Sequence, residues 1–284
     1  MRFVAALLFW LITTVLLAAA VPAMWAQRNV VSEDGYAALA AAAAKNPRLQ
    51  EAMASELATQ ITALAAKNGY DLNNTELVRG VTAAYTANSG FPGQFAQANR
   101  IAHRWMFTDS VKQEEGAGDR WLIDIAPMLN DSSLKQTLGN LNLEVPQTVM
   151  VPITVPESSA LRPGQLRPLA TWGPWASGGV CVLTAFFALL TLATARSRGK
   201  ALAALGVSGL LVGAAGWAGL EIGQRYINDA LNRTTGDIRT VADVMVNQAE
   251  ASLHHWLNVT LAVGVVLVVL GIIASMLGGL RRSD

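Results

Sequence analysis

Histidine side chains are the groups in this sequence best suited to acid–base chemistry. The chain has three of them: His103, His254 and His255. His103 follows Asn99 by four residues, so on a helix both side chains lie on the same face. With Arg100 between them, they could bind a polar ligand or a partner, and with an acid such as Asp124, His103 could act as a general base. The simpler interpretation, which we favour, is that Asn99 and His103 tie their helix to neighbouring backbone.

The other two histidines are adjacent and precede Trp256, a setting typical of a membrane interface. Contact with a lipid headgroup or a partner is the expectation there, because neighbouring residues on a helix point about 100° apart and chelate a metal poorly. Cys181 is the one cysteine, so no intrachain disulfide can form. The chain contains no nucleophile elbow, Walker loop, His-Glu-x-x-His or Cys-x-x-Cys motif. We therefore predict no metal and no cofactor.

The composition indicates a lipid environment. Hydrophobic residues make up 52% of the 284 residues and charged residues only 14%, against roughly a quarter in soluble domains. The net charge is +1 and no basic patch is present, which counts against a nucleic-acid partner.

Four long runs contain no Asp, Glu, Lys or Arg, and each is long enough to cross a bilayer as a helix. They are Phe3–Ala26, Trp172–Ala195, Ala201–Leu220 and Leu257–Leu280. The basic residues beside the runs lie on one side if the runs alternate in direction: Arg2, Arg196, Arg198, Lys200, Arg281 and Arg282. This positive-inside pattern predicts a multi-pass plasma-membrane protein with both termini in the cytoplasm. A cleaved signal peptide is an alternative for the first run, but the length of the run favours a retained anchor.

The expected domains follow from these runs. They are a transmembrane anchor (1–26), an extracytoplasmic domain (27–171), a second transmembrane helix (172–195), a cytoplasmic link (196–200), a third transmembrane helix (201–220), an extracytoplasmic helical hairpin (221–256), a fourth transmembrane helix (257–280) and a cytoplasmic tail (281–284).

Capping residues predict the helices of the extracytoplasmic domain. Ser32 precedes two acids, and Asn46-Pro47 opens a helix that runs to Lys67. Asn73 with Glu76 opens a third helix, and a fourth covers 93–107. Further along, 121–125 and 148–155 are strand-like runs that flank a short helix at 129–141. The fold class is therefore mainly α, with a small β element outside the membrane.

In the hairpin, charges of opposite sign recur every four residues, for example Arg239 and Asp243, as on a solvated helix face. Thr234-Thr235-Gly236 breaks the pattern and predicts the turn between two helices, against which the first domain could dock.

Glycines in the third run recur every three or four residues and so share one helix face: Gly206, Gly209, Gly213, Gly216, Gly219 and Gly223. Such a face allows helices to approach closely in a membrane. Its partner could be another span of the same chain or another subunit. The spans contain no charged residue, which counts against transport.

The order of parts resembles a group of actinobacterial, mycobacterial-type integral membrane proteins. The resemblance rests on Glu33-Asp34-Gly35-Tyr36, Asn46-Pro47, the segment 95–103 (Phe-Ala-Gln-Ala-Asn-Arg-Ile-Ala-His) and the segment 122–127 (Leu-Ile-Asp-Ile-Ala-Pro). The residue matches are close only in the last two segments, and the Ala-rich first helix differs from the pattern of this group. The resemblance implies a place in an actinobacterial cell envelope and no particular chemistry.

A non-enzymatic envelope protein is the leading hypothesis: an accessory or scaffold subunit that uses its extracytoplasmic domain to engage a membrane-protein partner or a second copy of itself. One alternative is binding of an envelope lipid or glycolipid in an apolar pocket of that domain. Another is a hydrolase or transferase that uses His103.

Overall fold

The computed structural model describes residues 2–67, 69, 75–108, 121–124, 150–153, 164–232 and 234–280. The chain divides into two compact units. Unit 1 comprises Met1–Val30, Thr171–Asn228 and Glu250–Asp284, and unit 2 comprises Val31–Ala170 and Asp229–Ala249.

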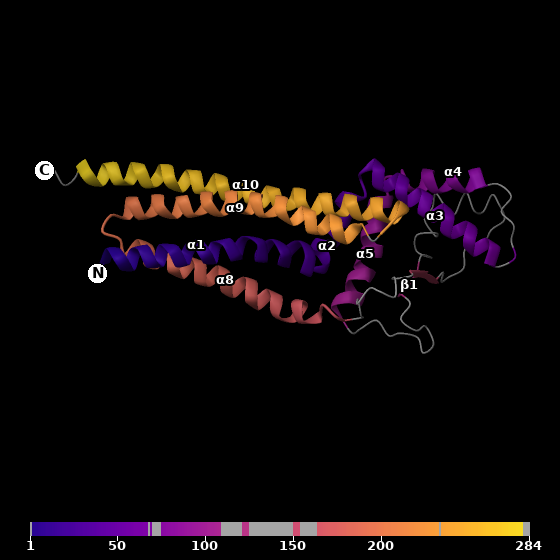
Figure 1. Ribbon diagram of the computed structural model, residues 1–284, viewed down its shortest axis with the longest axis horizontal. Coiled ribbons are helices and arrows are strands. Elements are labelled where there is room, and N and C mark those ends of the chain that lie inside the picture. The colour runs from indigo at the N-terminus through magenta and orange to yellow at the C-terminus, as the bar shows by residue number, and fades with distance from the viewer. Residues whose placement is uncertain are drawn as a thin grey trace. The chain divides into compact units, whose positions relative to one another are not determined.

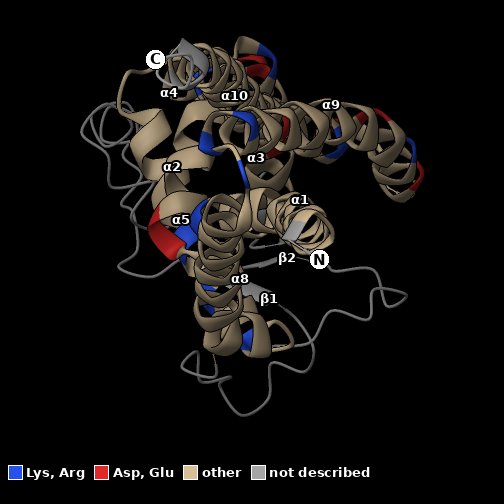
Figure 2. Cartoon of the chain, turned by 90° about the vertical axis from the view of Figure 1, so that its left-hand side faces the viewer, with Lys and Arg blue, Asp and Glu red and all other residues tan. Residues whose placement is uncertain are grey.

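Unit 1 is built from four long helices that lie side by side (Figure 1). They are α1 (Arg2–Ala26), continued by the π-helix η1 (Gln27–Val31), α8 (Arg167–Thr194), α9 (Arg198–Leu231) and α10 (Gly236–Leu280). Each is long and apolar enough to cross a membrane, which agrees with the four predicted spans. The charged residues of these helices lie toward their ends and leave long uncharged stretches. Figure 2 views the chain from a second direction, with the charged residues coloured.

Two boundaries differ from those predicted. Helix α8 begins at Arg167 rather than Trp172 and continues through Pro174. The link predicted at 196–200 is shorter, since α9 begins at Arg198 and its first turn includes Lys200. The amide of Ala201 already donates to the carbonyl of Ser197, as in a regular first helical turn.

Hydrogen bonds join α1 to α9 in the apolar part of unit 1. The indole Nε1 of Trp10 donates to the carbonyl of Ala204 at 2.8 Å, and the hydroxyls of Thr14 and Ser208 lie 2.7 Å apart. Ser208 is fully buried. In hydrocarbon these groups have no water to bond, so they bond to one another across the helix interface. Helix α1 is thus part of the bundle.

The predicted glycine face of α9 packs on α10 of the same chain over its first part. A Cβ added to Gly206 would lie 2.6 Å from the carbonyl oxygen of Gly264, and one added to Gly209 would lie 3.2 Å from the Cα of that residue. Gly213 and Gly216 lie against side chains of α10 in the same way. The sequence left open whether the glycine face packs on a span of the same chain or on another subunit. For this part of the face, the partner is a span of the same chain.

The rest of the glycine face is different. A Cβ added to Gly219 or Gly223 would meet no atom of the described residues within 4 Å, so the predicted packing face ends at Gly216. The surface on α10 that receives α9 is also formed by glycines, Gly264 and Gly271, which the sequence analysis did not single out. They escaped notice because a second glycine stripe is visible only once the two helices are paired.

Unit 2 begins with four helices: α2 (Glu33–Ala43), α3 (Pro47–Lys67), α4 (Thr75–Thr86) and α5 (Phe91–Phe107). The hydroxyl of Ser32 accepts a hydrogen bond from the amide of Gly35, and Asn46 Oδ1 accepts one from the amide of Arg48 at 2.9 Å. Both predicted helix starts are therefore confirmed, as is the end of α3 at Lys67. Helix α5 begins two residues before the predicted Gly93, because Pro92 fits the first turn of a helix.

Two four-residue strands, β1 (Trp121–Asp124) and β2 (Met150–Ile153), pair antiparallel with Leu122 opposite Pro152. They fall within the two runs for which extended structure was predicted. A proline is tolerated here because each strand of a two-stranded sheet is an edge strand. The helix predicted at 129–141 lies outside the described residues.

The core of unit 2 draws on distant parts of the chain. It contains small and aromatic side chains: Ala40, Ala43, Ala44, Leu49, Tyr85, Phe91, Phe95 and Val244. Val244 belongs to the first part of α10, with Val241 and Met245 packed beside it. The returning helix of the predicted hairpin thus contributes to the same core as α2 and α5, which agrees with the expectation that the two pack together.

The turn of the hairpin lies where it was predicted. Helix α9 ends at Leu231 and α10 begins at Gly236, whose φ of 70° is a left-handed conformation that favours glycine. Arg239 donates to Asn232 across the turn at 2.8 Å and lies 3.4 Å from Asp243, the pair predicted from the spacing. Arg233, another member of the charge series, lies outside the described residues.

The contact between α9 and α10 predicts unequal effects of one substitution at two glycines. Gly206→Ala should lower the melting temperature in detergent, because its Cβ would overlap α10 backbone and such overpacking costs about 1 to 3 kcal/mol. Gly219→Ala should leave stability unchanged or raise it, because space is open there and alanine favours a helix by about 1 kcal/mol. Equal losses for the two variants would contradict the packing described here.

Candidate functional site

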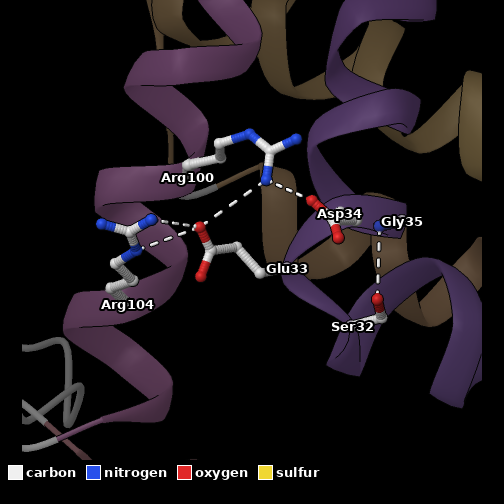
Figure 3. Close-up of polar contacts among 6 residues, drawn as sticks. All are labelled: Ser32, Glu33, Asp34, Gly35, Arg100 and Arg104. Carbon is white, nitrogen blue, oxygen red and sulfur yellow. Dashed lines mark hydrogen bonds and ion pairs between the residues drawn. The ribbon is translucent and has the colours of Figure 1, made fainter.

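The residues predicted to bind a ligand or partner in unit 2 lie on α5, where it faces the start of α2. Figure 3 shows Arg100 and Arg104, one turn apart on α5, reaching toward Glu33 and Asp34 in the first turn of α2. We call these four residues the charge cluster. Ser32 caps α2 beside them, so the two acids lie at the positive end of the helix dipole.

Arg104 makes the most extensive contact in the charge cluster. Its Nε and Nη2 atoms both donate to Glu33 Oε1, at 3.0 and 2.7 Å. Arg100 Nη1 donates to Asp34 Oδ1 at 2.5 Å and lies 3.7 Å from Glu33 Oε1. The cluster therefore links α2 to α5 through four side chains whose charges offset one another.

The cluster keeps Glu33 ionised. The hydrogen bond from Arg104 is the main cause that lowers the pKa of Glu33, burial opposes it, and the charges of Arg104, Arg100 and His103 add to the lowering. Since both guanidinium groups already bind carboxylates, they are poorly placed to recruit an anionic substrate. The sequence analysis missed Arg104, although its spacing of four from Arg100 could have indicated it.

His103 is packed among aromatic rings. It is 4% exposed, and its ring stacks on that of Phe107 with centroids 4.1 Å apart and planes 10° apart. The ring of Tyr36 lies on another side, with a centroid distance of 5.5 Å, and burial raises the pKa of the Tyr36 phenol. A ring held in this way is closed to a substrate from solvent. The side chain of Asp124, its suggested acid, lies outside the described part of the structure.

Asn99 does not point toward a ligand. Its Nδ2 donates to the carbonyl of Phe95 at 2.8 Å, which lies one turn earlier on the same helix. Asn99 is thus engaged with backbone, as the simpler interpretation expected, but the backbone is that of its own helix. Asn99, Arg100 and His103 share α5 yet serve three different contacts.

A second group of polar and aromatic residues gathers in unit 1 around residues 252–258 of α10. The ring of His254 stacks on that of Trp217 at 3.9 Å, and Trp217 Nε1 donates to Asn258 Oδ1 at 3.2 Å. Trp25 Nε1 donates to Ser252 Oγ at 3.2 Å, and the guanidinium carbon of Arg28 lies 5.6 Å from the centre of the Trp256 ring. We call these residues, Trp25, Arg28, Trp217, His254 and Trp256, the aromatic collar.

The collar changes the role expected of the two histidines. His254 is engaged with Trp217, whereas His255 is exposed, so the pair does not converge on one ligand. Arg28 comes from η1 and Trp217 from α9, and neither was predicted from the sequence as a site residue. Both residues are far from Trp256 in the sequence, so their positions along the chain could not have indicated that they lie in this group.

The described residues hold no group of three or more His, Cys, Asp or Glu placed to bind a metal ion. Cys181 is half-buried in α8. The geometry of the two groups above suits packing and recognition of charge better than it suits catalysis.

No family model, no curated protein and no solved structure matches the chain.

The charge cluster predicts an acid-sensitive contribution to stability. A carboxyl whose pKa is lowered on folding stabilises the folded state above its unfolded pKa, here near the ordinary value of 4.5, and this contribution is lost as the pH falls through the lowered pKa. The melting temperature of Glu33→Gln should therefore lie slightly below that of the wild type at neutral pH, and the gap should close in acid. The gap should be small because the pair is partly exposed and screened.

Glu76→Gln is the matched control, since Glu76 is exposed on α4 and forms no ion pair with another described residue. Its melting curve should follow that of the wild type at each pH. A gap for Glu33→Gln that stays constant from neutral to acid pH would contradict the role assigned to Glu33.

Proposed function

We propose that this protein is a non-enzymatic subunit of a cell-envelope membrane, which holds unit 2 outside the cytoplasm and uses it to engage a partner complex. The spans anchor the protein, and the helical unit provides the surface for recognition. It is an accessory or scaffold protein in this proposal, and its own polar groups serve its fold.

The engagement of those groups is the observation that supports the proposal. On α5, the residues with the chemistry to act on a substrate are occupied: His103 by the rings of Tyr36 and Phe107, Arg100 by Asp34, and Asn99 by backbone. A hydrolase or transferase based on His103 would first have to free a buried imidazole. A scaffold, in contrast, needs only the folded surface of unit 2 and no free catalytic side chain.

A second supporting observation is the way unit 2 is built. Its core includes Val244 from α10 together with Leu49 and Phe91, so segments before and after two of the spans, α8 and α9, contribute to one folded body. Part of this core is therefore supplied by the helix that continues as the last span. A unit of this kind suits a protein that presents a surface at a membrane.

Lipid binding is the second candidate, and the aromatic collar favours it. Indoles with hydrogen-bonded N–H groups and an arginine over a ring are typical of the headgroup level of a membrane. This evidence concerns the ends of the spans and not a pocket within unit 2.

The proposed location can be tested with single cysteines. In a Cys181→Ala background, a cysteine at Gln97, exposed on α5, should react with a membrane-impermeant maleimide added to intact cells. A cysteine at Ser197, in the link before α9, should react only after the membrane is opened, since the basic residues beside it favour the cytoplasmic side. The reverse pattern would contradict the orientation and the proposal with it.

Engagement of a partner can be tested by mild chemical cross-linking in the native membrane followed by purification. The wild-type chain should carry a partner in fixed stoichiometry. Leu49→Ala should reduce the amount recovered, because Leu49 is fully buried in the core of unit 2 and its truncation costs about 2 to 5 kcal/mol.

Leu189→Ala is the matched control, since it makes the same change on α8 at a side chain that is 65% exposed. It should retain the partner. A wild-type protein that is recovered alone, or a partner that Leu49→Ala retains in full amount, would contradict the proposed function.

A further inference from the structure

The aromatic collar contains a cation, Arg28, whose charge is not offset by an ion pair with the described residues. Arg28 lies in η1 with an exposed side chain, and no Asp or Glu of the described residues forms an ion pair with it. Glu250, the acid of α10 nearest the collar in sequence, accepts a hydrogen bond from Gln224 at 2.8 Å. The environment of Arg28 is the Trp256 ring, 5.6 Å from its guanidinium carbon.

A guanidinium group over an indole keeps its donors available. The ring attracts the flat face of the cation, while the five N–H bonds lie in the plane of the group and point outward. This plane matches two oxygens of a phosphate, which arginine binds through paired hydrogen bonds. Arg28 is therefore positioned by one contact and left with the donors that an anion requires.

The position of Arg28 is supported by its surroundings. The chain forms a π-helix at Gln27–Val31, and the carbonyl of Trp25, at the junction with α1, accepts a hydrogen bond from Asn29 Nδ2 at 2.9 Å. Trp25 Nε1 is bonded in turn to Ser252 of α10. These contacts tie the end of α1 to the turn of α10 that precedes Trp256.

Both partners lie at the ends of uncharged runs. Arg28 follows the run Phe3–Ala26 by two residues, and Trp256 immediately precedes the run Leu257–Leu280. Lipid phosphates lie at the depth where such runs end, and anionic lipids attract basic side chains there. Arg28, the Trp256 ring and the phosphate of a bilayer lipid are therefore expected at the same depth in the membrane.

We propose that Arg28 and Trp256 form a binding site for the phosphate of an anionic phospholipid headgroup. Arg28 supplies paired donors and charge, and Trp256 orients the guanidinium. The exposed His255, next to Trp256, lies beside this site on α10. This site deepens the second candidate function and is independent of the proposed scaffold role, because it uses unit 1 alone and does not require a protein partner.

The test is native mass spectrometry of the full chain, purified in detergent and supplied with equal amounts of phosphatidylglycerol and phosphatidylcholine. The wild type should retain phosphatidylglycerol preferentially. Arg28→Gln should reduce this preference by about fivefold, the effect expected of one basic residue near a membrane surface. Arg28→Lys should keep part of it, since lysine keeps the charge but loses the paired donors, and Trp256→Leu should also reduce it.

Arg79→Gln is the control, because Arg79 is exposed on α4 in unit 2, and it should behave as the wild type. An unchanged preference in Arg28→Gln would overturn the proposal. So would binding of inorganic phosphate by the wild type, and not by Arg28→Gln, without any preference for phosphatidylglycerol, since the ligand would then be free phosphate. The test stands apart from the cross-linking experiment, so failure of one leaves the other intact.

Discussion

The close approach of α9 and α10 is the constraint on which the rest of the structure depends. At Gly206 and Gly264 the two backbones come so near that even a methyl group on either residue would overlap the other helix. The same holds at Gly199 and Gly271. In a bilayer the hydrophobic effect does not hold helices together, so dispersion contacts between smooth helix faces must do so. A glycine stripe on each helix makes such contact possible.

Helix α10 also takes part in the other main features of the protein. Its first part supplies Val244 to the core of unit 2, residues 252–258 hold the indoles of the collar, and the rest receives α9. No break interrupts it from Gly236 to Leu280.

Polar contacts contribute differently to stability in the two units. In unit 1 the hydroxyls of Thr14 and Ser208 face each other where water is scarce, so leaving one unpaired would carry a desolvation cost. In unit 2 the charge cluster is partly exposed, so its ion pairs are screened and orient α2 against α5 more than they stabilise them. The stability of unit 2 comes mainly from its buried alanines and from Leu49, Phe91 and Phe95.

The amino-acid sequence by itself determined the features that depend on local chemistry. Uncharged runs must be helical in a bilayer, Ser32 and Asn46-Pro47 begin helices through their own side chains, and Gly236 marks a turn through its backbone freedom. Only the tertiary structure decided which of these elements meet. It ended the glycine face at Gly216, placed Arg104 on Glu33, buried His103 between rings, and brought Arg28 to Trp256. Apart from the stacking of His103 on Phe107 within α5, these contacts join different helices, and their partners are set by packing, which no spacing along one segment encodes.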